Sequence, residues 1–336
     1  MSHSTEHNSR PEQSATLFIA ASETDSNLYY ATRFIAPDPF IYLEVKGERL
    51  MVMSDLEVDR ARNQATVDRV LSYSELERRA KSQGVKDPGT IDVIHLVLQD
   101  AGLKDILVPP TFPFLHASRL QEMGYRLRTK RDPFYEQRVM KSDDEVRHIE
   151  AAQRATETAV AAAHQHLRRA EIRDNVLWLD GEILTSERVK KLINVALMEC
   201  DCVAQHTIVA GGEQACDPHD EGSGPLPAHR SIIFDVFPRS AGTRYFADMS
   251  RTVVRGTPSP ELTRLYHAVK DAQEEAITKI RDGADGAASH QGICDRFEKA
   301  GYKTGLVNGR MQGYFHGTGH GVGLDIHEAP RISRTG

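Results

Sequence analysis

The stretch Gly313–Pro330 reads GYFHGTGHGVGLDIHEAP and holds three histidines, His316, His320 and His327. A glycine inside a helix costs about 1 kcal/mol relative to alanine, so the glycine-rich run argues against a helix. Alternate glycines instead favour extended backbone that another strand or a ligand approaches closely. This is not the HExxH zinc helix, because Gly317 stands where that motif needs its glutamate. In an extended chain His316 and His320 share a face, and His327 projects from the other unless the strand bends. So many histidines on such a backbone indicate a functional site rather than packing.

The composition is that of an ordinary soluble globular protein, with 336 residues, 40% of them hydrophobic and 27% charged. This length is enough for two domains, each with its own core. The net charge of -6 is modest, and the sequence lacks a basic stripe with interleaved aromatic residues, so nucleic-acid binding is not expected. No apolar run approaches the roughly 20 residues of a membrane span, so no membrane partner is expected.

The opening residues, MSHSTEHNSRPEQS, are polar and lack the basic start and apolar core of a secretory signal. We interpret residues 1–14 as a disordered tail. The four cysteines, Cys200, Cys202, Cys216 and Cys294, form no CxxC pair and no disulfide-framework spacing. Reduced thiols are typical of a cytosolic protein, so we expect a cytoplasmic location.

The N-terminal half, residues 15–135, alternates apolar strands with helical segments, a pattern typical of an α/β layer domain. It gathers no catalytic residue types, which indicates a scaffold, a cap or an oligomerisation domain. Strands are predicted at 16–22, 40–45, 49–54, 105–109 and 125–130, and helices at 75–81, 91–101 and 115–123. The second and third strands read as a hairpin joined at Lys46-Gly47-Glu48.

A domain boundary is predicted between Asp132 and Ser142. Ser142 and Glu145 have the spacing of a capping box, in which each side chain satisfies an orphan backbone N–H of the first helical turn. A long alanine-rich helix should follow to about Ala170. Further segments are expected as a helix at 182–200, a strand at 202–212, and a loop at 213–228 that carries His219.

Two carboxylates are expected to face each other on a hairpin spanning residues 231–256. Asp235 interrupts an apolar strand and Asp248 lies in the next one, around a turn centred on Ala241-Gly242. That turn would place the two aspartates roughly opposite, with side chains about 5 Å apart. Two such buried carboxylates are costly unless a cation lies between them. The alternative is that one aspartate caps a turn while the other pairs with Arg244 or Arg251.

The two aspartates followed by HGTGHGVGLDIHEAP resemble the creatinase/prolidase/aminopeptidase P metallopeptidase family, which has the pita-bread fold. The likeness covers most of Ser142–Arg331, and SRTVVRG after Asp248 is its other specific part. The resemblance implies an N-terminal creatinase-like non-catalytic domain at 15–135 and a metallopeptidase catalytic domain at 142–336. The expected fold class is therefore α/β (α+β), an N-terminal α/β domain followed by a pita-bread domain.

By this resemblance Asp235 and Asp248 would ligate metal, with Asp248 bridging two ions, and His320 would ligate one of them. His219 and His327 would contact the substrate and the developing oxyanion, and His316 would line the pocket. Two divalent ions would share a hydroxide that attacks the peptide carbonyl. Oxygen-rich ligation with one imidazole suits manganese, cobalt or iron at least as well as zinc, and manganese is the metal we expect.

The sequence departs from the family in two ways. The interval from Asp235 to Asp248 is longer than usual by about two residues, and an even insertion preserves the face of each side chain. The family also has two further glutamate ligands on later strands, whereas the only acids after His320 are Asp325 and Glu328. We therefore expect the pita-bread domain to be incomplete at its C-terminus and a C-terminal segment of the parent protein to be missing.

The resemblance implies an enzyme that hydrolyses the bond between an N-terminal residue and proline, as an Xaa-Pro aminopeptidase or dipeptidase. Its partner would be a small peptide with proline in the second position, and the protein would be a homodimer. The absent glutamates leave a second hypothesis open, an inactive pseudoenzyme that serves as a peptide-binding module. A third hypothesis is a relative that acts on a non-peptide C–N bond, as creatinase does.

Overall fold

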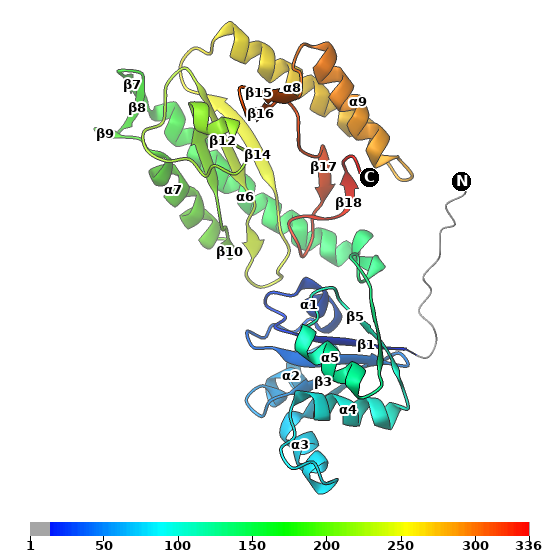
Figure 1. The fold of residues 1–336 in the computed structure, drawn as a ribbon. Coiled ribbons are helices and arrows are strands. Elements are labelled where there is room, and N and C mark those ends of the chain that lie inside the picture. The colour runs from blue at the N-terminus through cyan, green and yellow to red at the C-terminus, as the bar shows by residue number, and fades with distance from the viewer. Residues whose placement is uncertain (1–13, 336) are drawn as a thin grey trace, which may run out of the picture. The chain divides into compact units, whose positions relative to one another are not determined.

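The computed structural model describes residues 14–335, which form two compact units that divide after Tyr135 (Figure 1). Of the predicted tail, only Ser14 falls within the described residues, and it is the first residue of a strand. Residues 1–13 lie outside the described part of the chain. No helix among residues 14–335 combines the length and apolar character that a membrane span requires.

The N-terminal unit is built on a six-stranded mixed sheet in the order β4-β3-β2-β1-β5-β6. Its strands are β1 (Ser14–Ala20), β2 (Phe40–Val45), β3 (Glu48–Met53), β4 (Arg69–Ser72), β5 (Asp105–Val108) and β6 (Arg126–Thr129). Its helices are α1 (Ser26–Thr32), α2 (Val58–Gln64), α3 (Tyr73–Ser82), α4 (Thr90–Ala101) and α5 (Phe114–Glu122). The predicted hairpin is confirmed: β2 and β3 are antiparallel, and Lys46 and Gly47 both have positive φ, as a two-residue turn of this kind requires.

The C-terminal unit has its core between a three-stranded antiparallel sheet and two helices, α6 (Asp143–Arg169) and α7 (Ser186–Met198). The sheet has the order β11-β12-β14, with β11 (Ile208–Gly211), β12 (Ser231–Val236) and β14 (Met249–Val254). Helix α6 (Asp143–Arg169) begins at the predicted capping box of Ser142 and Glu145. Its buried residues are mostly small (Ala152, Ala155, Ala159, Ala163), and they share one core with Ile232, Phe234 and Val236 of β12. Small side chains let the helix approach the sheet closely, which fixes the strand that carries Asp235.

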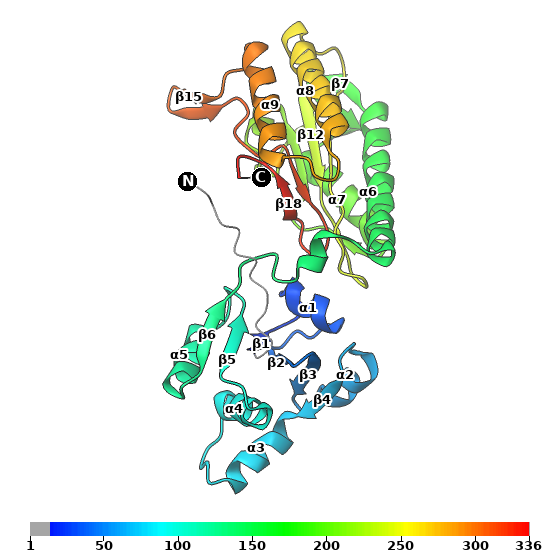
Figure 2. The same ribbon diagram turned by 90° about the vertical axis from the view of Figure 1, so that its right-hand side faces the viewer.

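The remaining elements of this unit are short strands, two 3-10 turns and three helices. They are η1 (Glu136–Val139), β7 (Glu171–Arg173), β8 (Val176–Leu179), β9 (Glu182–Ile183), α7 (Ser186–Met198), β10 (Cys202–Val203), η2 (Gly212–Cys216), β13 (Arg239–Ser240), α8 (Pro260–Lys279), α9 (Gly286–Lys299), β15 (Gly305–Val307), β16 (Arg310–Gln312), β17 (Gly319–Gly321) and β18 (Glu328–Ile332). Helices α8 and α9 pack against each other, as both ribbon views show (Figures 1 and 2).

Two sequence-based boundaries in this unit are wrong. The helix predicted at 182–200 begins only at Ser186, because Glu182 and Ile183 pair with β8 and Thr185 caps the helix through its side chain. The strand predicted at 202–212 is two strands, β10 and β11, that belong to different sheets. Between them His206 has a φ of 59°, which extended backbone does not allow.

Candidate metal centre

Strand β12 presents Asp235 on the face turned away from the helical core. Ile232, Phe234 and Val236 are fully buried against that core, so the alternation of a strand places Asp235 on the opposite face. The Ser250 hydroxyl donates a hydrogen bond to Asp235 Oδ1 from the neighbouring strand β14. This contact fixes the orientation of the carboxylate.

The register of the hairpin differs from the predicted one. Asp235 lies opposite Ser250, and Val236 lies opposite Met249, so Asp248 is two residues away from the position facing Asp235. Asp248 also lies directly before β14, which begins at Met249, and not within the strand as predicted, so the two aspartates are not opposite each other.

The glycine-rich stretch forms a second hairpin, β17–β18, which we call the histidine hairpin (Gly319–Ile332). The predicted extended backbone is found only at Gly319–Gly321, and the rest of residues 313–327 forms bends and irregular backbone. The predicted close approach of another strand is confirmed at Gly321, where a Cβ atom would lie 2.4 Å from the Ala329 carbonyl oxygen. The pairing register shifts between His320 and Gly321. The chain bends back beyond this point, and the rings of His320 and His327 lie 4.4 Å apart at an interplanar angle of 81°.

The imidazole of His320 is oriented by its own backbone. Its Nδ1 lies 3.0 Å from the Gly321 carbonyl oxygen, and because a carbonyl only accepts, Nδ1 must carry the proton. In the neutral ring Nε2 is then an unprotonated acceptor, and it lies 3.3 Å from Asp248 Oδ2. Two acceptors face each other, an arrangement that is favourable only with a proton or a cation between them. Metal-ligating histidines commonly donate their other ring N–H in this way.

The carboxyl of Asp248 is perturbed in the direction that such a site requires. Burial, and then the negative charge of Asp235, raise the pKa of Asp248 to about 6, against the smaller lowering effect of His320. Two carboxylates and one imidazole are a donor set that suits divalent cations, so the residues fit the implied metal. Within residues 14–335, however, no three His, Cys, Asp or Glu side chains form a preassembled metal cluster.

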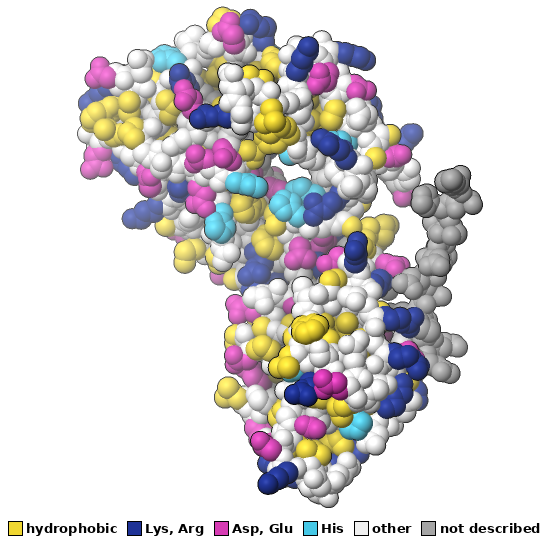
Figure 3. Space-filling view, viewed as in Figure 1, with side chains coloured by type: hydrophobic (Ala, Val, Ile, Leu, Met, Phe, Trp, Pro, Cys, Tyr) yellow, Lys and Arg dark blue, Asp and Glu magenta, His cyan; other side chains and the backbone are white. Residues whose placement is uncertain are grey.

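Two further histidines lie in the same electrostatic environment. The pKa of His327 is lowered by partial desolvation of its ring, then by the positive charges of His320, Arg331 and His219, while Asp235 opposes the change. His219 lies in the loop after η2, where its backbone N–H donates to Asp217 Oδ1 at 3.0 Å. The rings of His219 and His327 are exposed, and Figure 3 shows histidine side chains gathered on one face of the C-terminal unit. A ligand can therefore reach them.

His316 belongs to a different group of side chains. Its ring packs on Tyr314 at 4.7 Å between centroids, and its charge lowers the pKa of the neighbouring His290 of α9, whose shift arises first from burial and then from Arg334. His290 Nδ1 lies 2.9 Å from Thr318 Oγ1. The structure therefore gathers Asp235, Asp248, His320, His327 and His219, and it places His316 on the α9 side of the hairpin.

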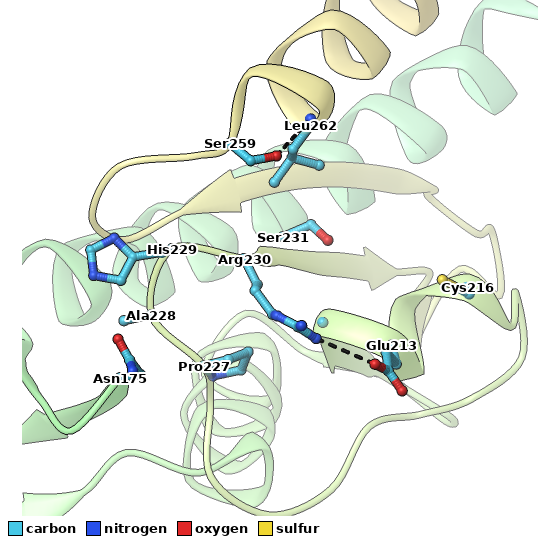
Figure 4. Close-up of a pocket in the computed structure, with 11 residues that line it drawn as sticks. Asn175, Glu213, Cys216, Pro227, Ala228, His229, Arg230, Ser231, Ser259 and Leu262 are labelled. Atoms are coloured by element: carbon cyan, nitrogen blue, oxygen red, sulfur yellow. Dashed lines mark hydrogen bonds and ion pairs between the residues drawn. The ribbon is translucent and has the colours of Figure 1, made fainter. Parts of the chain in front are cut away.

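A cavity lies in another part of this unit. It has a volume of about 660 Å³ and opens at the start of β12, where Glu213 and Arg230 form an ion pair of 3.5 Å (Figure 4). None of the predicted site residues lines it. The candidate centre is thus recognised by its convergent donor atoms and not by its volume.

Sequence reasoning missed the residues that hold the site together. Ser250 orients Asp235, and Arg138 and Lys141 form ion pairs with Glu328 of the histidine hairpin. Of these residues, only Glu328 could have been found from the sequence, because it directly follows His327.

Comparison with known proteins places this chain in a family. The sequence profile of metallopeptidase family M24 matches residues 147–336. An uncharacterized peptidase of Staphylococcus epidermidis is 31% identical over 167 residues, which are 49% of this chain and 44% of that protein. An Xaa-Pro dipeptidase of Pyrococcus horikoshii is 25% identical over 236 residues, which are 69% of this chain and 61% of that protein. These alignments thus span less than two thirds of the relatives' own length.

The fold is also found among solved structures. An Xaa-Pro dipeptidase from Bacillus anthracis superposes with a TM-score of 0.76 at 19% identity, over 95% of this chain and 80% of that one. The prolidase from Pyrococcus furiosus superposes with a TM-score of 0.72 at 20% identity, over 95% and 83% of the two chains. The expected fold is confirmed as that of the prolidases and aminopeptidases P. With its profile matched over more than half of its length, the chain belongs to metallopeptidase family M24.

Proposed function

We propose that this protein is a metal-dependent peptidase that hydrolyses the bond between an N-terminal residue and proline, as an Xaa-Pro aminopeptidase or dipeptidase. The observation that carries the proposal is the approach of His320 Nε2 to Asp248 Oδ2, 3.3 Å apart, with Asp235 close enough to raise the pKa of Asp248. The preference for proline is supported by the names of the P. horikoshii relative and the B. anthracis structure, both Xaa-Pro dipeptidases.

Asp235, Asp248 and His320 would hold the divalent ions, of which we propose two, with manganese as the metal. Bound ions of this kind polarise a peptide carbonyl and lower the pKa of water to near neutrality, which supplies the hydroxide nucleophile. The chain itself orients the ligands: Ser250 fixes Asp235, and the Gly321 carbonyl oxygen fixes the tautomer of His320.

His219 and His327 would act on the substrate. Their rings are exposed beside the carboxylates, where an imidazole N–H can donate to the carbonyl oxygen of the scissile bond. A donor that points to the place where negative charge develops stabilises the transition state more than the ground state. We assign these two histidines to oxyanion stabilisation and substrate contact, and His316, which is turned toward α9, to the outer wall of the pocket.

The test is hydrolysis of an Xaa-Pro dipeptide by protein that has been stripped of metal with a chelator and then supplied with Mn²⁺. We expect hydrolysis only with the metal, and a rate for Asp248→Asn that is lower by more than about 100-fold. Asp100→Asn is the matched control, because it makes the same change at an exposed ion pair with Arg79 in the N-terminal unit. Equal rates for wild type and Asp248→Asn would refute the proposal.

A second candidate function is a peptide-binding module without turnover. It is favoured by one observation, that residues 14–335 hold no preassembled cluster of three metal-ligating side chains. In this case the protein would bind an Xaa-Pro peptide in a titration yet leave it intact at saturating Mn²⁺. The hydrolysis assay and the binding titration together separate the two functions.

A further inference from the structure

A buried ion network joins the start of the C-terminal unit to the histidine hairpin. Arg138 in η1 and Lys141, just before α6, both pair with Glu328, the first residue of β18. Arg138 Nη2 lies 2.6 Å from Glu328 Oε2 and 2.7 Å from Asp325 Oδ2. The side chains of Arg138, Lys141 and Glu328 are only 8%, 14% and 10% exposed, so this is not a solvated surface pair.

The network holds both oxygens of one carboxylate. Oε2 of Glu328 accepts from Arg138, and Oε1 accepts from Lys141. Because charge-assisted bonds to both oxygens fix the plane of a carboxylate as well as its position, Glu328 cannot rotate without breaking one of the two ion pairs.

Glu328 is placed where both histidine-bearing segments meet. It follows His327 directly in the sequence, and its Cα pairs across the hairpin with Gly321, the residue after His320. A Cβ atom at Gly323 would lie 2.3 Å from Glu328 Oε1, so the loop between the strands closes directly over the carboxylate. A shift of Glu328 would therefore move both imidazoles.

The hairpin has little apolar burial of its own with which to hold its position. Within Gly319–Ile332 only Gly323 and Leu324 are buried. A backbone hydrogen bond of 2.8 Å from Phe246 N–H to the Gly323 carbonyl oxygen joins the hairpin to the segment that leads into Asp248. The ion network and this hydrogen bond are thus two of the contacts that hold the histidine hairpin, with His320 and His327, in place beside the aspartates.

We propose that Arg138 and Lys141 are positioning residues, which hold Glu328 and so fix His320 and His327 relative to Asp248. Their effect on turnover rests on the proposed peptidase function. Their effect on the geometry of the two imidazoles does not, because it concerns the metal-free chain alone.

The test compares Glu328→Gln with Glu275→Gln. Glu275 is a matched control, because it also pairs through its two oxygens with one lysine and one arginine, Lys279 and Arg296, but between α8 and α9. In metal-free protein with ¹³C-labelled histidine, Glu328→Gln should shift the ring signals of His320 and His327, and Glu275→Gln should leave them in place. At saturating Mn²⁺, kcat should fall on the order of 10- to 100-fold with little change in KM.

Each outcome is informative. Unmoved ring signals in Glu328→Gln overturn the proposal, as do moved signals with an unchanged kcat. If the wild type hydrolyses no peptide, the proposed function fails, and the ring signals alone decide whether the network positions the histidines. Arg138→Lys is the second variant should Glu328→Gln not fold: it keeps the charge but loses the paired contacts with Asp325 and Glu328, and it should give a smaller shift in the same direction.

Discussion

At the scale of single residues, the candidate centre is a place where the folded chain accepts an unfavourable arrangement. His320 Nε2 and Asp248 Oδ2 are both acceptors at 3.3 Å, and the charge of Asp235 adds to the cost of ionising Asp248. Carboxyl groups with a perturbed pKa are common at functional sites. Here the closely placed acceptors disfavour the metal-free fold and favour the binding of a cation. The tautomer of His320, fixed by the Gly321 carbonyl oxygen, makes the centre ready for that cation.

Removing the charge of Asp248 should therefore stabilise the metal-free protein. The pKa of Asp248 is about 6, above the ordinary carboxyl value, so the ionised form destabilises the fold. The penalty is absent below pH 4 and fully present above pH 6, and it amounts to at most about 3 kcal/mol. We expect Asp248→Asn to raise the free energy of unfolding at pH 8 in the presence of a chelator, and the gain to shrink toward pH 5.

Denaturant titrations at the two pH values measure this difference. Asp100→Asn is the control of opposite sign, because a hydrogen bond from Arg79 lowers the pKa of Asp100, and its removal should not stabilise the protein. A wild type and an Asp248→Asn variant of equal stability at pH 8 would contradict this account of the centre.

At the scale of elements, the histidine hairpin depends on two glycines, Gly321 and Gly323, that let its strands and loop close over each other. At Gly321 an added Cβ would meet the Ala329 backbone oxygen at 2.4 Å, whereas at Gly317 the nearest atoms would be 3.5 Å away, an ordinary contact. The bend after His320 that brings the imidazoles of His320 and His327 together is thus a consequence of where glycine stands in the stretch.

Gly321→Ala should separate β17 from β18, and Gly317→Ala should be tolerated. Overpacking of this kind costs typically about 1–3 kcal/mol, and here backbone and not a flexible side chain is in the way. Hydrogen exchange at the Thr318 amide, which donates to the Ile332 carbonyl oxygen at 2.7 Å, should become faster in Gly321→Ala than in Gly317→Ala. Equal exchange in the two variants would show that close approach at Gly321 does not hold the hairpin.

At the scale of the whole molecule, the sequence predicted what local patterns determine. The β2–β3 hairpin follows from alternation around Lys46-Gly47, and the start of α6 follows from the Ser142 and Glu145 capping box. Contacts between distant parts of the chain could not be predicted from these local patterns. The pairing of Asp235 with Ser250 depends on how residues 237–248 fold between the strands, and Arg138 meets Glu328 across 190 residues. The homodimer and the manganese stay predictions.

The most direct test of the central claim, that Asp235, Asp248 and His320 form a divalent-cation site, is the binding of Mn²⁺ to the purified protein, measured by the loss of the free-ion electron paramagnetic resonance signal. The account predicts micromolar or tighter binding in the wild type and in Asp100→Asn, and binding weaker by at least about 10-fold in Asp248→Asn and in His320→Gln. Binding of Mn²⁺ with the same affinity in all four proteins would contradict it.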